Sequence, residues 1–161
     1  MTQRNAPMEG SYRRLLMWLM HRYFAFSRGM TLGVRAACYN DKGEIFLVRH
    51  SYLPGWYMPG GGVERGETLP NALEKEIREE GNLVLTAPAE LVHVYLNTKA
   101  SPRDHVVFYK AKVKQTAPRP RDWEIVECGF FDPENLPDGT SASTRRRLEE
   151  LSGLLPHDDF W

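Results

Sequence analysis

Three glutamates, Glu76, Glu79 and Glu80, are spaced so that they can act together on one ligand. On an α-helix, residues at positions i, i+3 and i+4 lie on one face, about one turn apart. Carboxylates this close repel one another, and a bound divalent cation relieves that repulsion. Hard carboxylate oxygens suit Mg²⁺ or Mn²⁺, and Mg²⁺ usually shares its coordination shell with water and substrate phosphates. By itself, such a cluster is more often the solvated acidic face of a surface helix.

A glycine-rich loop, Pro59 to Gly62, comes directly before the acidic segment. Glycines leave the backbone unobstructed, so the carbonyl of Gly60 could coordinate a metal while the amide of Gly61 approaches a substrate phosphate. Three glycines alone are a weak signal, because a flexible turn would look the same. The loop, Glu67 and the acidic cluster in one short register are much harder to obtain by chance.

That register resembles the Nudix box, G-x5-E-x7-R-E-U-x-E-E-x-G-U, in which U is an aliphatic residue. The matching positions are Gly61, Glu67, Glu76, Ile77, Glu79, Glu80 and Leu83. Two positions depart from it, since Lys75 stands where Arg is usual and Asn82 where the second Gly is usual. Asparagine is the best non-glycine choice for a left-handed cap. Lysine lacks the planar fork of arginine and holds a carboxylate as a point charge.

The resemblance extends over roughly residues 30–137 and implies a Nudix-type α/β/α sandwich with a mixed central sheet. It implies hydrolysis of a phosphoanhydride bond, either in a nucleoside diphosphate linked to another group X or in a nucleoside triphosphate. The cofactor that it implies is Mg²⁺, with Mn²⁺ as a substitute. By carry-over, Glu79 and Glu80 are the surest metal ligands, the Gly60 carbonyl is a further candidate, and Glu76 is a ligand or the base that activates water. The positions that would support the helix and its charges are Glu67 and Lys75.

Candidate residues outside the box are less well defined. Some family members take the base, or another ligand, from a glutamate outside the box, for which Glu124 and Glu127 are candidates. Their odd spacing puts them on opposite faces if both lie in a strand, and Glu124, nearer the loop, is slightly favoured. Arg49 could bind a substrate phosphate or form a surface ion pair. Trp56 or Tyr57 could stack on a base or brace the loop.

The elements that must position these residues interleave strands and helices, which favours a layered α/β sandwich. The acidic helix should begin near Thr68, a favourable N-cap, and end at Gly81 and Asn82. A closing helix is expected at 143–151. Strands are expected at 32–39, 44–49, 91–97, 105–114 and 124–131, the first two forming a hairpin.

Composition describes an ordinary domain of 161 residues, 42% hydrophobic and 26% charged. Lys plus Arg and Asp plus Glu both total 21, which does not suit a general nucleic-acid binder. We interpret the arginines at 145–147 as a solvated helix face. Cys38 and Cys128 lie in apolar stretches, so we expect inert thiols and a reduced, cytoplasmic compartment.

The hydrophobic segment 15–20 is too short for a transmembrane helix, which needs about 20 apolar residues. We expect an N-terminal extension, 1–29, that contains an amphipathic helix, followed by one domain at 30–161. The helix would pack on the domain or on a second subunit, which would make the protein a homodimer, and peripheral membrane contact is a further reading.

Three functions remain open. The first is an enzyme that acts on a small nucleotide, with ADP-ribose, a sugar nucleotide or a modified nucleoside triphosphate as candidates. The second is a nucleotide sensor with weakened catalysis, which Lys75 and Asn82 favour. The complete set Glu67, Glu76, Glu79 and Glu80 favours the enzyme. The third is an interaction role for the N-terminal helix, compatible with either.

Overall fold

The computed structural model describes residues 8–161 of the chain, which divides into two units, one ending at Met30 and the other comprising Thr31–Trp161. The first unit holds one helix, α1 (Met8–Ser27), in the segment where a helix is expected. Within α1, the Arg22 guanidinium lies 5.5 Å from the ring centroid of Trp18, a cation–π contact across one helical turn. No helix within 8–161 is long and apolar enough to cross a membrane.

The second unit is built on a mixed sheet in the order β3-β5-β1-β2-β6, with β4 also paired to β5. Parallel pairing between β1 and β5 runs from Thr31 opposite Asp104 to Tyr39 opposite Lys112, at the centre of the sheet. The expected hairpin of β1 and β2 is confirmed. The strands are β1 (Thr31–Tyr39), β2 (Ile45–His50), β3 (Leu83–Leu85), β4 (Glu90–Leu96), β5 (Asp104–Gln115) and β6 (Ile125–Phe131).

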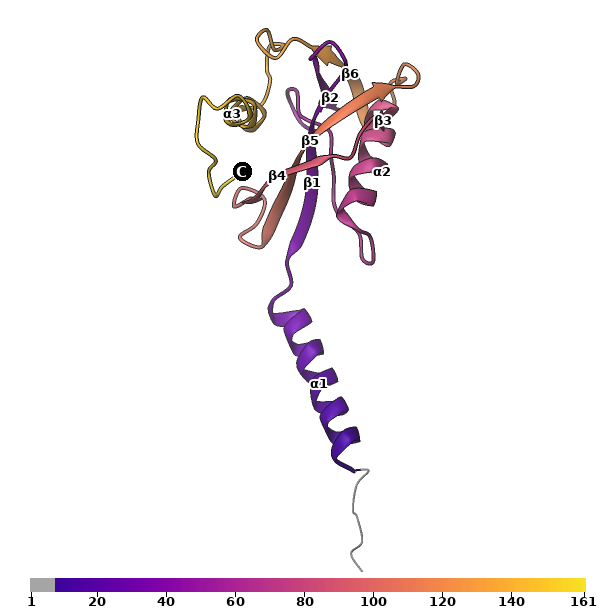
Figure 1. Ribbon diagram of the computed structural model, residues 1–161, viewed down its shortest axis with the longest axis vertical. Helices are drawn as coiled ribbons and strands as arrows, with labels where there is room; N and C mark the ends of the chain where they lie inside the picture. The colour runs from indigo at the N-terminus through magenta and orange to yellow at the C-terminus, as the bar shows by residue number, and fades with distance from the viewer. Residues whose placement is uncertain (1–7) are drawn as a thin grey trace, which may run out of the picture. The chain divides into compact units, whose positions relative to one another are not determined.

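Helices α2 (Leu69–Gly81) and α3 (Ala142–Leu151) lie on opposite sides of this sheet (Figure 1). Successive residues of a strand point to opposite faces of the sheet, so alternate residues pack in two separate hydrophobic cores. In β2, Phe46 and Val48 pack in the cluster that contains the buried face of α2, whereas Ile45 and Leu47 pack in the cluster that contains Leu148 of α3. The layered α/β sandwich predicted from the sequence is confirmed.

Helix α2 has the boundaries that its capping residues predict. The side chain of Thr68 accepts a hydrogen bond from the amide of Asn71, and Pro70 lies in the first turn. Asn82 ends the helix in the left-handed conformation with a φ of 52°. One stripe of α2 is buried against the sheet by Ala72, Leu73 and Ile77. Glu80 is buried on the same side, whereas Glu74, Arg78 and Glu79 are exposed.

Three features differ from expectation or add to it. Strand β3 is not expected from the pattern, because its three residues directly follow the Asn82 cap and are too few to show a period. Glu124 lies just before β6 instead of within it. The interpretation of 145–147 as a solvated face is wrong for Arg147, which is fully buried and donates hydrogen bonds to Glu150 and to the Phe160 carbonyl.

The burial of Arg147 depends on residues that lie far away in the sequence. Its guanidinium packs 4.0 Å from the ring centroid of Tyr95, and the Tyr95 hydroxyl donates to the same Glu150 that the arginine contacts. A buried charge is tolerated only when it is paired and hydrogen-bonded. The two cysteines are free thiols, as expected, and burial raises the pKa of both Cys38 and Cys128.

Candidate active site

The predicted acidic cluster lies in a polar cleft of about 270 Å³ between the second half of α2 and the loop that leads into β6. Both Glu76 and Glu80 border this cleft, and Glu124 faces them from the loop. Three carboxylates from one helix and two from a distant loop thus share a single concave surface. The residues that line the cleft are Glu76, Glu79, Glu80, Arg119, Asp122, Glu124 and Ile125.

Glu80 is the buried member of the cluster, with 6% of its surface exposed. The Gly60 amide donates a hydrogen bond of 2.8 Å to its Oε2, while Oε1 lies 3.7 Å from Nε2 of His50. Burial raises the pKa of Glu80 to about 8, against the lowering effect of the Gly60 hydrogen bond and the Arg35 charge, and the charges of Glu76 and Glu124 raise it further. The carboxylates of the cleft therefore raise one another's pKa, and a divalent cation would relieve their repulsion.

The glycine loop approaches strand β1 so closely that a side chain is excluded at Gly60. Its φ is +145°, and a Cβ there would lie 2.1 Å from the Val34 carbonyl oxygen. On either side of it, the carbonyls of Pro59 and Gly61 accept hydrogen bonds from the amides of Ala36 and Val34. Within the described part of the chain the Gly60 carbonyl accepts none, so it is available as a ligand.

Glu76 packs against the next glycine of the loop. A Cβ on Gly61 would lie 2.5 Å from Oε2 of Glu76, so the glycine provides the space that this carboxylate occupies. Burial raises the pKa of Glu76, the Lys75 charge lowers it, and the charges of Glu79, Glu124 and Glu67 raise it. Glu76 is therefore a partly desolvated carboxylate at the border between the cleft and the loop.

Lys75 links the acidic cluster to Glu64 and Glu67, which precede α2. Its Nζ lies 3.3 Å from each carboxylate oxygen of Glu67, 3.6 Å from Oε1 of Glu64 and 3.7 Å from Oε1 of Glu76. The lysine is thus a point charge among three carboxylates. The amide of Glu64 also donates to Glu67, and this hydrogen bond and Lys75 together lower the pKa of Glu67.

Glu124 is positioned by a loop that is tied to the end of α2. The Arg119 side chain donates a 2.7 Å hydrogen bond to the Glu79 carbonyl and also pairs with Asp122. Asp122 in turn accepts hydrogen bonds from the amides of Glu124 and Ile125. The hydrogen bond from Arg119 and these amides lower the pKa of Asp122 to about 2. The chain of contacts fixes the backbone of Glu124 relative to the helix.

Sequence reasoning missed His50, at the end of β2. It is 5% exposed, and its Nδ1 has no hydrogen-bond partner within residues 8–161. One ring nitrogen of His50 and one oxygen each of Glu80 and Glu124 lie within 4.8 Å of one another. Burial and the nearby Arg35 lower the pKa of His50, and a neutral imidazole keeps a lone pair. The alternation of β2 could have revealed it. Every second residue of the strand points to the same side of the sheet, and Phe46 and Val48, which precede His50 at this spacing, point toward α2.

The candidate substrate residues Arg49 and Trp56 are not among those that line the acidic cleft. Arg49 forms a 2.7 Å ion pair with Glu127, its register partner on β6, and both side chains are about half exposed. Trp56 is buried in the cluster on the α3 side, edge-on to the Phe131 ring. The Tyr57 hydroxyl donates to the Pro54 carbonyl, inside its own loop.

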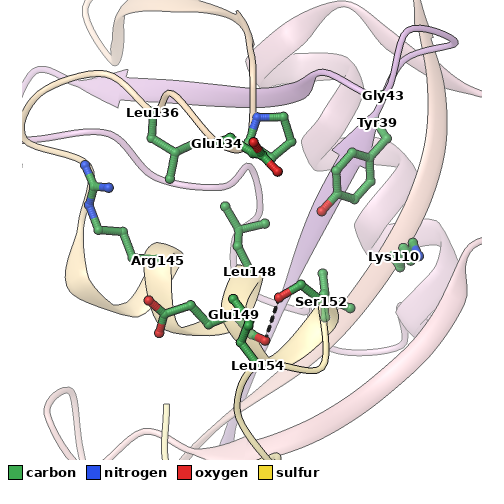
Figure 2. Close-up of a pocket in the computed structure, with 12 residues that line it drawn as sticks. Tyr39, Gly43, Lys110, Glu134, Leu136, Arg145, Leu148, Glu149, Ser152 and Leu154 are labelled. Atoms are coloured by element: carbon green, nitrogen blue, oxygen red, sulfur yellow. Dashed lines mark hydrogen bonds between the residues drawn. The ribbon is translucent and has the colours of Figure 1, made fainter.

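A larger hollow of about 580 Å³ lies elsewhere, between α3 and the end of the β1–β2 hairpin. Figure 2 shows Tyr39 and Lys110 from the sheet lining it with Leu148 from α3 and Ser152, which caps that helix. The dashed line marks the hydrogen bond from the Ser152 hydroxyl to the Glu149 carbonyl. Among the described residues, the group of metal-binding donors is in the acidic cleft and not in this hollow. The acidic cleft is therefore the candidate active site, although it is the smaller of the two.

The family model of the NUDIX domain matches residues 29–151. An ADP-ribose pyrophosphatase of Methanocaldococcus jannaschii is 37% identical over 99 residues, which are 58% of this chain and 57% of that protein. The 8-oxo-dGDP phosphatase NUDT18 of Mus musculus is 27% identical over 124 residues, 73% of this chain and 37% of that protein. The chain therefore spans less than two thirds of the length of these curated relatives.

Solved structures share the fold. A MutT NUDIX hydrolase from Burkholderia pseudomallei superposes with a TM-score of 0.64 at 27% identity, covering 75% of this chain and 97% of that one. An ADP-ribose pyrophosphatase from Streptococcus suis superposes with a TM-score of 0.60 at 27% identity, covering 79% and 94%. The sandwich described above is thus the fold of these hydrolases.

Proposed function

Since this chain belongs to the Nudix hydrolase family, we propose that it hydrolyses a phosphoanhydride bond in a nucleotide, with a divalent cation bound in the acidic cleft. The single observation that carries the proposal is the convergence of Glu76, Glu80 and Glu124 on one cleft, where Glu80 also accepts a hydrogen bond from the amide of Gly60. The raised pKa of Glu80 supports it, because burying a carboxylate is costly unless a cation compensates the charge.

The donor set fits a hard cation. We assign the metal to oxygens of Glu76, Glu79 and Glu80 and to the Gly60 carbonyl, with Mg²⁺ as the expected ion and Mn²⁺ as its substitute. When bound, the cation neutralises charge on the phosphoryl oxygens and lowers the pKa of coordinated water. The Gly60 amide holds Oε2 of Glu80, while Oε1 lies near Nε2 of His50. Either Glu124 or, in place of its role as a ligand, Glu76 accepts the proton of the attacking water.

The proposed substrate class is a nucleoside diphosphate linked to another group X, or a nucleoside triphosphate. Relatives named as an ADP-ribose pyrophosphatase and as an 8-oxo-dGDP phosphatase support a small nucleotide with a phosphoanhydride bond. We assign catalysis to the domain at 30–161. The N-terminal extension, 1–29, is not required for metal binding in this proposal.

The test is a substrate panel that measures phosphate-containing products from ADP-ribose, sugar nucleotides, dinucleoside polyphosphates and ordinary and oxidised nucleoside triphosphates. Each reaction is run with Mg²⁺, with Mn²⁺ and with chelator. Glu80→Gln serves as the inactive variant, and Glu74→Gln, an exposed residue of the same helix, is its matched control. We expect metal-dependent cleavage of one class, lost in Glu80→Gln and kept in Glu74→Gln. Full activity of Glu80→Gln would contradict the metal-site assignment.

The second candidate is a nucleotide sensor, which the position of Lys75 favours. Its ammonium lies equally far from both oxygens of Glu67, without the two parallel hydrogen bonds that an arginine would form. No cleavage anywhere in the panel, together with nucleotide binding measured by calorimetry, would favour the sensor over the enzyme.

A further inference from the structure

The buried imidazole at the end of β2 has no role in the function proposed so far. We propose that His50 is a nitrogen ligand of the metal in the acidic cleft, in a mixed site with Glu80 and Glu124 that leaves Glu76 to accept the proton of the attacking water. This inference rests on the proposed function, because it needs a metal in the cleft. It adds a donor that lies outside the box, at the end of β2, next to Glu80 and Glu124.

The geometry that carries the proposal is a meeting of three separate segments. His50 comes from the end of β2, Glu80 from α2 and Glu124 from the loop before β6, and one donor atom of each lies within 4.8 Å of the others. Nε2 of His50 is 3.7 Å from Oε1 of Glu80, too far for a normal hydrogen bond. A cation between such atoms would satisfy all three at once.

A purely structural role leaves a polar atom of His50 unexplained. The side chain is 3% exposed, yet Nδ1 has no hydrogen-bond partner in the described chain. Most buried side-chain polar atoms in proteins have at least one partner. The ring itself is held between aromatic neighbours, with centroid distances of 5.1 Å to Tyr52 and 6.1 Å to Tyr57. The imidazole is thus fixed in place by packing, with Nε2 turned toward Glu80.

A nitrogen ligand changes which metal the site prefers. Carboxylate, carbonyl and water oxygens suit Mg²⁺, whereas imidazole suits later first-row transition metals such as zinc, nickel and copper. Divalent first-row metals generally bind such sites more tightly in the order Mn²⁺ to Co²⁺ to Ni²⁺. Removing His50 should therefore weaken Mn²⁺ and Co²⁺ binding more than Mg²⁺ binding.

The direct test is pulsed electron paramagnetic resonance of the full chain loaded with Mn²⁺, which detects a ¹⁴N nucleus bound to the ion. Electron spin-echo modulation from ¹⁴N is expected in the unmodified protein and should change when histidine is labelled with ¹⁵N. The matched variants are His50→Gln and His105→Gln. His105 also has a buried Nδ1 without a partner among the described residues, but it lies on β5 and outside the donor group.

We expect His50→Gln to abolish the nitrogen modulation and to weaken Mn²⁺ binding by at least about tenfold in calorimetry, a loss seen even for residues that only support metal ligands. His105→Gln should keep both. Mn²⁺ bound to the unmodified protein without nitrogen modulation would overturn the ligand assignment and leave the proposed function standing. Failure of the unmodified protein to bind Mn²⁺ or Mg²⁺ would overturn both.

Discussion

The carboxylate of Glu76 lies directly against the α-carbon of Gly61, where an added Cβ would come within 2.5 Å of Oε2 and 2.7 Å of Oε1. The contact joins the loop to the acidic face of α2. It means that the loop and the helix cannot change independently, since the place of one carboxylate depends on the absence of a side chain opposite it.

Replacing Gly61 by alanine should displace Glu76 and lower turnover while the domain stays folded. We expect kcat to fall by at least about tenfold, which corresponds to about 1.4 kcal/mol in the activation barrier. The matched control is Gly62→Ala, because a Cβ at Gly62 meets nothing within 4 Å. The measurement is the steady-state kinetics of both variants, with thermal unfolding to check that each is folded. Equal activity of the two variants would contradict this role for Gly61.

The buried Glu80 predicts a pH-dependent stability of the metal-free protein. Its pKa is about 8 in the fold against a reference value of 4.5, so its favourable contribution is complete below about pH 4.5 and is lost as pH rises through 8. In chelator, the free energy of unfolding should fall relative to Glu80→Gln by up to about 1.4 kcal/mol per pH unit in this window. Mg²⁺ should reverse the loss, because it compensates the ionised carboxylate.

Thermal unfolding between pH 5 and 9, with and without Mg²⁺, measures this effect. Glu74→Gln is the matched control, since Glu74 is exposed on the same helix and its variant should keep the unmodified dependence on pH. Parallel curves for the unmodified protein and Glu80→Gln in chelator would show that Glu80 is not buried as an unpaired acid.

Exchanging Lys75 for arginine should preserve or raise activity. A guanidinium can donate two parallel hydrogen bonds to Glu67, where the ammonium now lies 3.3 Å from both oxygens. Lys75→Met removes the charge among Glu64, Glu67 and Glu76, and we expect it to lower kcat/KM by about tenfold or more, since a charge-assisted hydrogen bond contributes about 1.5–3 kcal/mol. If Lys75→Arg were the more damaging of the two, the site would require lysine specifically.

The left-handed cap at Asn82 predicts a graded effect on stability. Alanine at this φ of 52° should cost about 1–2 kcal/mol in the free energy of unfolding. Glycine adopts the conformation freely but loses the 3.2 Å hydrogen bond from the Asn82 side chain to the Pro118 carbonyl, so it should cost less than alanine. Urea denaturation ranks the three proteins, and alanine equal to asparagine would mean that the cap is not strained.

Much of the site could be predicted because its information is local. Thr68 caps the start of α2 and Asn82 caps its end, and both caps can be recognised from the local sequence alone. Once the helix is placed, positions 76, 79 and 80 share one of its faces. The position of Glu124, which faces these carboxylates across the cleft, was harder to predict. We expected it inside a strand, and it lies just before that strand. Predicting that His50 points into the site would have required assigning each residue of β2 to one side of the sheet. Its surroundings also include the ring of Tyr52 and Glu80, which come from other elements.

The rest of the fold depends on contacts between distant segments. Nothing local to Arg147 predicts its burial, because Tyr95 and Phe160, which it contacts, come from other parts of the chain. The three residues of β3 pair with the end of β5, opposite Gln115, and are too few to be recognised alone. The roles of Arg49 and Trp56 in substrate binding stay predictions, and neither residue lines the acidic cleft.

The parallel pair at the centre of the sheet has a consequence for how the protein folds. Thr31 and Asp104, which pair at the start of β1 and β5 and also share a side-chain hydrogen bond, are 73 residues apart in the chain. Closing so long a loop costs entropy before any contact repays it, and such pairings form slowly. Helix α2 lies within that loop and packs against β1, one of the two paired strands. The carboxylates should therefore converge late in folding, and a nascent chain that has not yet released β5 from the ribosome holds no assembled metal site.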